Sequence, residues 1–124
     1  FEVKFDVIKP GHVLVPVVEL YNEEDVIVFI AHDRDPAWQR NPRPAGRYVS
    51  TARIPGNFLA EGTMTVSAVL MTESPFRLHA HAPRALGFRV DDSGDGDSAR
   101  GDFHGRWPGV VRPILQWRTR FTPM

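Results

Sequence analysis

The segment spanning residues 47–71, RYVSTARIPGNFLAEGTMTVSAVLM, constrains the fold of this chain more than any other. Its second half alternates strictly, with Met64, Val66, Ala68 and Leu70 on one side and Thr63, Thr65 and Ser67 on the other. This period of two is typical of a β-strand with one buried face. We therefore predict strands over residues 47–54 and 63–71 that form a central hairpin. Turn residues bound the connection, residues 55–62, and its apolar Phe58 and Leu59 are expected to close one end of the core.

Further strands are predicted along the rest of the chain, over residues 1–8, 12–21, 26–31, 85–90 and 110–118. Pro16 marks the second of these as an edge or bulged strand, because proline cannot donate to a ladder. The third, apolar on both faces, reads as a central strand. Three stretches, residues 32–46, 72–83 and 91–102, lack periodicity and are predicted as loops. Short strands separated by turn signals, without a helical period, indicate an all-β protein and an antiparallel β-sandwich.

Composition limits the classes of function. A length of 124 residues suits one domain, residues 1–124. Lys+Arg and Asp+Glu are both 15, which argues against nucleic acid or an acidic membrane held by bulk charge. The chain has no cysteine, which is compatible with a reducing compartment, and no apolar run of about 18 residues that would span a membrane. It begins within a strand-like segment without methionine, so we expect a fragment of a longer protein.

Catalytic motifs are absent. The sequence contains no phosphate-binding loop, nucleophile elbow, zinc-protease motif or dinucleotide fingerprint. His79 and His81 are the best metal candidates, because side chains two apart on a strand share a face, and His32 or His104 would have to complete the site. Nothing in the sequence fixes a third ligand, so we predict no catalytic residue, metal or cofactor.

Tryptophans and arginines point instead to recognition of a polar ligand. Aromatic rings stack on the apolar faces of sugars, while arginine and hydroxyl side chains bond the sugar hydroxyls. Trp38 lies in the polar segment 32–46, where an exposed ring is expected, whereas Trp117 alternates in phase with Leu115 and reads as core. The predicted sugar surface combines Trp38 with one polar sheet face made of Arg47, Thr51, Arg53, Thr65 and Ser67.

An ordered series of motifs resembles one protein family over nearly the whole chain. The motifs are PAGRY at residues 44–48, RIPGNFLAEG at 53–62, FRVD at 88–91, SARG at 98–101 and GVVRPILQW at 109–117. Together they resemble the C-terminal domain of the ATPase subunit of bacterial polysaccharide ABC transporters, the Wzt type that exports O antigen and related glycans.

The resemblance implies an immunoglobulin-like β-sandwich that binds carbohydrate and dimerises by exchanging its terminal strand. The ligand would be the finished end of an undecaprenyl-linked polysaccharide, read on the cytoplasmic face of the bacterial inner membrane. A nucleotide-binding domain would precede this segment and link it to the transmembrane subunit, so the segment itself would not be an enzyme. The family's sugar contacts vary with the glycan, so the resemblance assigns no binding residue here.

The last predicted strand is expected to pair with a partner chain, because an open edge carrying large apolar side chains would invite aggregation. The expected interface residues are Val111, Arg112, Leu115 and Trp117. Two alternatives to glycan binding remain at this point. One is a dimerisation or regulatory domain of the transporter that binds no sugar, and the other is a metal-dependent sugar-modifying enzyme that would use His79 and His81.

Overall fold

A computed structural model describes residues 1–124 and contains six β-strands and no helix. The strands are β1 (Glu2–Val7), β2 (Val15–Tyr21), β3 (Ile27–His32), β4 (Gly46–Thr51), β5 (Gly62–Glu73) and β6 (Phe76–Val90). No helix long and apolar enough to cross a membrane is therefore present. The predicted all-β class is confirmed.

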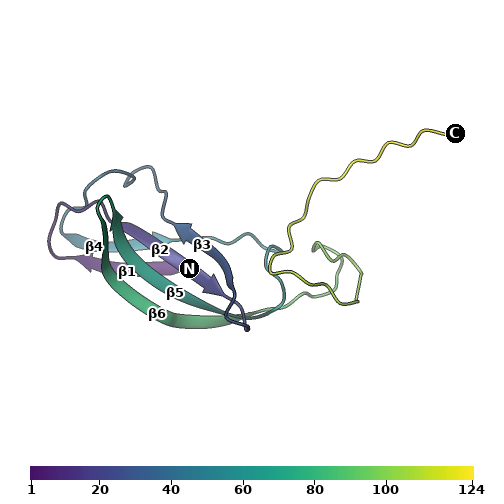
Figure 1. Ribbon diagram of the computed structural model, residues 1–124, viewed down its shortest axis with the longest axis horizontal. Helices are drawn as coiled ribbons and strands as arrows, with labels where there is room; N and C mark the ends of the chain where they lie inside the picture. The colour runs from purple at the N-terminus through teal and green to yellow at the C-terminus, as the bar shows by residue number, and fades with distance from the viewer.

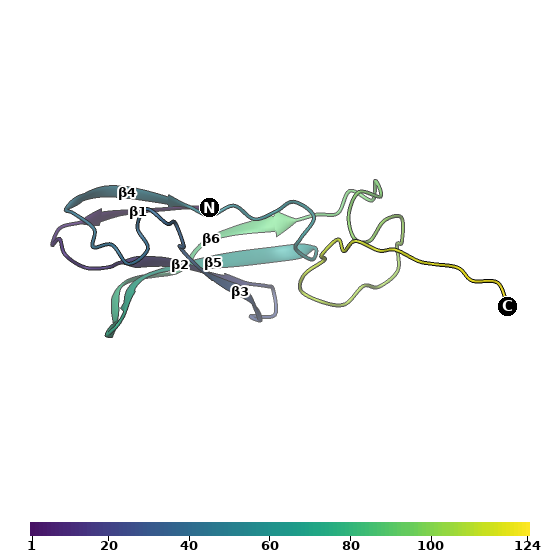
Figure 2. The same cartoon turned by 90° about the horizontal axis from the view of Figure 1, so that it is seen from above.

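The strands form two antiparallel sheets that pack face to face (Figures 1 and 2). One sheet has two strands, β1 and β4, and the other has four in the order β3-β2-β5-β6. Figure 2 shows β1 and β4 as a layer above β2, β3 and β5. The predicted β-sandwich is thereby confirmed.

The core lies between the two layers. Its centre consists of Val18, Leu20, Met64 and Val66, from the neighbouring strands β2 and β5. Leu20 is fully buried and Met64 is 2% exposed. The alternation in residues 63–71 thus reads correctly, since the apolar side faces the core while Thr65 points to the other face of the sheet. Leu59, from the connection before β5, packs against this cluster as expected.

The predicted central hairpin is wrong in its pairing. β4 pairs with β1, from Glu2 opposite Thr51 to Val7 opposite Gly46, whereas β5 lies in the other sheet between β2 and β6. The connection that holds Phe58 and Leu59 crosses from one layer to the other, because β4 and β5 belong to different sheets. Local alternation fixed the faces of both strands but carried no information about their partners.

The strand predicted at the sheet edge and the strand predicted at its centre have exchanged places. β2, which contains Pro16, is an inner strand between β3 and β5, and β3 is an edge strand whose Ile27 and Ile30 are about half exposed. β2 tolerates proline because Pro16 is its second residue and the ladder to β3 begins only at Val17.

The stretch at residues 72–83, predicted as a loop, instead belongs to a long hairpin. β5 and β6 pair from Glu73 opposite Phe76 to Gly62 opposite Val90, with two register shifts. The proline and histidines that suggested a loop lie at the hairpin tip or on a strand exposed to solvent. Strand β6 pairs only with β5, so its other edge is free.

The C-terminal segment departs most from the prediction, because residues 110–118 form no strand within the chain. Val111 makes one isolated bridge to Leu59, and the chain beyond it extends away from the body of the molecule (Figure 1). Trp117 is 87% exposed rather than part of the core. Arg112 is 6% exposed and buried within its own chain, which removes it from the predicted dimer interface.

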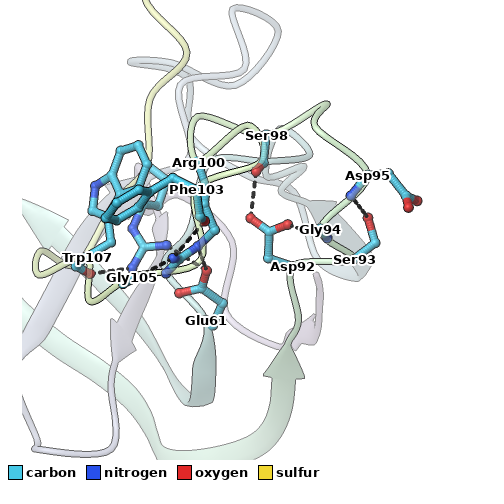
Figure 3. A network of polar contacts seen from close by, with 11 residues as sticks. Glu61, Asp92, Ser93, Gly94, Asp95, Ser98, Arg100, Phe103, Gly105 and Trp107 are labelled. Atoms are coloured by element: carbon cyan, nitrogen blue, oxygen red, sulfur yellow. Dashed lines mark hydrogen bonds and ion pairs between the residues drawn. The ribbon is translucent and has the colours of Figure 1, made fainter.

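Arg112 belongs to an ion-pair network that fastens residues 91–112 to the sandwich. Its Nη1 donates to Glu61 Oε1 at 2.7 Å and its Nη2 donates to the Trp107 carbonyl at 2.6 Å. Arg100 Nε reaches the same Glu61 oxygen at 3.1 Å. Figure 3 shows Glu61 below Arg100 and close to Trp107, with Asp92 and Ser98 bonded to each other beside them. One carboxylate thus connects two arginines that are distant from it in sequence.

Acid should weaken this attachment. The hydrogen bond from Arg112, assisted by that from Arg100, lowers the pKa of Glu61 from its usual 4.5 to about 2 despite partial burial. Because the folded-state pKa lies below the unfolded one, the network's contribution is complete above pH 4.5 and declines as pH falls toward about 2. We expect urea melts to show a falling free energy of unfolding across this window. The decline should be smaller in Glu61→Gln, and an equal decline in both proteins would contradict the assignment.

Candidate functional site: a cleft at the loop end of the sandwich

The largest cleft lies at the end of the sandwich opposite the C-terminal segment, with a volume of about 690 Å³. Three parts of the chain form it: the β1–β2 connection, the β3–β4 loop and the tip of the β5–β6 hairpin. In Figure 1 these three connections gather at the end of the molecule away from the C-terminus. Most of the residues that line the cleft are polar or charged, including His12, Arg34, Gln39, Arg40, Thr72 and Arg77.

The β3–β4 loop is ordered by its own side chains. Asp33 Oδ1 accepts the Asp35 amide at 2.9 Å, and Asp35 Oδ1 accepts the Ala37 amide at 3.0 Å. The Asp35 carbonyl then accepts the amides of Trp38 and Gln39 at 3.0 and 2.9 Å. Aspartate favours such turns because its carboxylate satisfies amides two residues onward. The prediction of a loop between β3 and β4 is confirmed, and the loop presents Trp38 and Gln39 in a defined position.

Arg43 anchors this loop to the rest of the protein. Its side chain is 3% exposed, and its guanidinium lies 5.1 Å from the Trp38 ring centroid, 5.2 Å from Tyr48 and 5.5 Å from Phe5. Nη2 is 3.6 Å from Asp33 Oδ2, so the buried charge is compensated by a carboxylate and three aromatic faces. The Arg43 amide also donates to the His12 carbonyl at 3.0 Å, which joins two walls of the cleft.

Trp38 lines the cleft, as predicted for a ligand-binding ring, but it is half buried rather than freely exposed. Its ring meets Tyr48 edge-on, with centroids 5.3 Å apart. Packing against Tyr48 and Arg43 fixes the ring, so a ligand entering the cleft would meet a pre-positioned aromatic surface.

The predicted polar sheet face does not exist as one surface. Arg47 and Thr51 lie on the outer face of the two-stranded sheet, where Arg47 pairs with Asp6 at 2.9 Å. Thr65 and Ser67 lie on the outer face of the four-stranded sheet, on the other side of the sandwich. Arg53 follows β4 and is exposed. The grouping failed because it rested on pairing β4 with β5, which belong to different layers.

Thr65 and Ser67 instead support Arg84, a residue that no sequence pattern singled out. The Arg84 amide donates to Ser67 Oγ at 2.8 Å and its Nη1 donates to Thr65 Oγ1 at 3.0 Å. Nη2 pairs with Asp25 at 2.9 Å, and the guanidinium lies 5.0 Å from the Tyr21 ring centroid. Both terminal nitrogens and one face of this group already have partners in the same chain, so the cluster reads as a structural contact across the strands.

The histidines do not assemble into a metal centre. The His79 ring lies 5.0 Å from that of His12, and His32 faces Glu73 at 3.4 Å. The structure contains no group of three or more histidine, aspartate and glutamate side chains close enough to hold a metal ion. Burial, together with repulsion from His12 and Arg77, lowers the pKa of His79.

Arg43 and Arg77 are the important cleft residues that sequence reasoning missed. The only available signal for Arg43 was an arginine among prolines in a long loop, which does not reveal burial. Arg77 fell within the stretch wrongly assigned as irregular.

A scan against models of known protein families finds no match to this chain. A search of curated protein sequences likewise finds no significant match.

Proposed function

We propose that this chain is a non-catalytic glycan-binding domain whose sugar site is the cleft at the loop end. One observation carries the proposal: a pre-positioned tryptophan, Trp38, lines the same cleft as several exposed side chains able to bond hydroxyl groups. Gln39 offers a neutral donor and acceptor there, and Arg34, Arg40 and Arg77 offer charged donors. The Thr72 hydroxyl donates to the Pro75 carbonyl at 3.1 Å and can still accept a hydrogen bond. Aromatic faces combined with planar polar side chains suit a ring that is apolar on one side and hydroxylated at its edge.

The family resemblance supplies the biological setting of the proposal. In that setting the chain is an immunoglobulin-like domain that reads the end of an undecaprenyl-linked polysaccharide for an ABC transporter. It would act at the cytoplasmic face of the bacterial inner membrane, joined through an upstream ATPase domain to the transmembrane subunit. The ordered motifs over residues 44–117 support this setting.

A second candidate function is dimerisation without sugar binding, and the C-terminal segment favours it. Ile114, Leu115, Trp117 and Phe121 are 60%, 61%, 87% and 84% exposed in the single chain. Large apolar side chains gathered on a segment with no partner in its own chain are typical of an interaction surface. We propose that this segment adds to a free strand edge of a second copy, and that β6, the longest edge strand, offers the acceptor edge. The C-terminal segment itself lies at the end of the molecule away from the cleft (Figure 1).

Titration by heteronuclear NMR tests the glycan site. We expect the exported polysaccharide of the source organism to shift the Trp38 indole signal and the amides of the β3–β4 loop, whereas an unrelated glycan should not. Each sugar contact is worth only about 1 kcal/mol net, so weak, fast-exchange binding is expected. Absence of shifts in the cleft, or shifts confined to the outer face around Tyr21 and Arg84, would contradict the assignment.

A pair of tryptophan variants adds an independent check. Trp38→Ala should weaken binding by about tenfold, since an aromatic contact is worth roughly 1 kcal/mol beyond its buried area. Trp117→Ala removes an exposed ring at the opposite end and should leave the affinity per chain unchanged. Because Trp38 also packs against Arg43, its loss could affect folding. Circular dichroism melts of both variants check that they remain folded.

A further inference from the structure

The charge around the cleft is unbalanced although the whole chain is neutral. Four arginines line it, Arg34, Arg40, Arg43 and Arg77, against two carboxylates, Asp33 and Glu73. His12 lies on the same wall. The chain as a whole has 15 basic and 15 acidic residues, so this surplus of two positive charges is local to the cleft.

Two of these arginines have no ion-pair or hydrogen-bond partner for their side chains within the protein. Arg43 is committed to Asp33 and the aromatic rings, and Arg34 lies 3.9 Å from Glu73. Arg40 and Arg77 form no ion pair and no side-chain hydrogen bond, and both are exposed. They come from different elements, the β3–β4 loop and the start of strand β6, so they approach the cleft from separate walls.

The conformation of Arg40 shows that its place is specified. Its φ is 64°, in the left-handed region that arginine seldom adopts. The neighbouring Asn41 holds the turn, with its amide donating to the Trp38 carbonyl at 3.0 Å and its Nδ2 donating to the Ala37 carbonyl at 2.9 Å. The same turn therefore positions Arg40 and the Trp38 ring together.

We infer that the cleft selects an acidic glycan, in which a sugar ring rests on Trp38 and a carboxylate or phosphate group on it is bound by Arg40 and Arg77. Guanidinium groups match the geometry of both anions and bind them by paired, charge-assisted hydrogen bonds. A neutral sugar would leave the two arginines unpaired, whereas an acidic sugar uses them. This inference rests on the proposed glycan-binding function and narrows it to a class of ligand.

A matched set of small ligands tests the inference. Glucuronic acid, glucose 6-phosphate, glucose and inorganic phosphate are titrated separately into the protein, with Trp38 indole and arginine Nε–H signals followed by NMR. We expect at least one acidic sugar to bind about tenfold more tightly than glucose, because hydrogen bonds to charged groups are stronger than neutral ones. Comparison of the two acidic sugars separates carboxylate from phosphate recognition. Arg40→Gln and Arg77→Gln should each remove most of this preference. Arg106→Gln should leave it unchanged, because Arg106 is also exposed and unpaired but lies outside the cleft.

The outcomes separate failure of the inference from failure of the proposed function. Equal binding of glucose and both acidic sugars at Trp38 would overturn acidic selection and leave the glycan site standing. Inorganic phosphate binding as tightly as glucose 6-phosphate would show an anion site without sugar contacts and overturn the inference. No shift in the cleft with any of the three sugars would contradict both.

Discussion

Replacing Arg112 by alanine is expected to lower the free energy of unfolding by about 3 kcal/mol, because removing the buried partner of an ion pair takes away its strongest hydrogen bond to the other charge. Arg112 is 6% exposed and bonds both Glu61 and the Trp107 carbonyl, so its loss frees an acceptor on each side. Glu61 keeps Arg100 and some contact with water, which places the effect near the lower end of the range for buried pairs. Urea titration followed by tryptophan fluorescence measures it, with Trp107 reporting on the segment directly.

The matched control is Arg106→Ala. Arg106 is an exposed arginine in the same segment and makes no ion pair or side-chain hydrogen bond, so its removal should change stability by less than about 0.5 kcal/mol. Similar losses in the two variants would show that the segment depends on net charge rather than on the contacts of Arg112. Amide exchange adds a local reading, since residues 91–112 should lose protection before β2 and β5 do.

The sequence predicted the strands well where one face is buried and the other is not. Met64 and Val66 reached the core and Thr65 the opposite face, because a period of two determines which side each residue occupies once a strand exists. Periodicity cannot state which strand lies beside it. The error in pairing β4 with β5 therefore followed from assuming that consecutive strands are neighbours. Because the two strands belong to different sheets, the predicted sugar residues lie on two separate outer faces.

Exposure was harder to predict than strand position. Val26, Ile27 and Ile30 have the composition of a central strand, yet they belong to an edge strand and its approach, and each is about half exposed. Residues 72–83 looked irregular because of their prolines and histidines, although Phe76, Leu78, Ala80 and Ala82 alternate with polar residues. In the structure this part of β6 is exposed on both faces, and Phe76 and Leu78 lie outside the core. Both errors arise because a sheet wider than its covering layer has strands that lie partly outside the core.

The cleft could be predicted only in part. A long polar loop containing Trp38 drew attention to the correct region, and the ring does line the largest cleft. The remaining walls come from the β1–β2 connection and the hairpin tip, which are distant in sequence and meet only through tertiary packing. Arg43 illustrates the limit, because nothing local to an Arg-Pro-rich loop shows that one arginine is enclosed by Phe5, Trp38 and Tyr48.

Cutting the chain after Pro113 is expected to convert a dimer into a monomer. The removed segment carries Leu115, Trp117 and Phe121 at alternating positions, so in an extended conformation these side chains share one face. Burying each against a partner would contribute about 1.5–3 kcal/mol, enough in two copies to hold a dimer at micromolar concentration. Light scattering coupled to gel filtration measures the mass of the full and shortened chains.

Two point variants show whether the alternation itself matters for this association. Trp117→Asp places a charge on the apolar side of the segment and should favour the monomer strongly, because a buried carboxylate without a partner is costly. Gln116→Asp introduces the same charge one residue earlier, on the opposite side of an extended strand, and should leave the dimer intact. Equal effects at the two positions would show that general repulsion, rather than strand addition by one face, governs the association. A complete 124-residue chain that stays monomeric at high concentration would contradict exchange of this segment, and the exposed apolar face would then need a different partner.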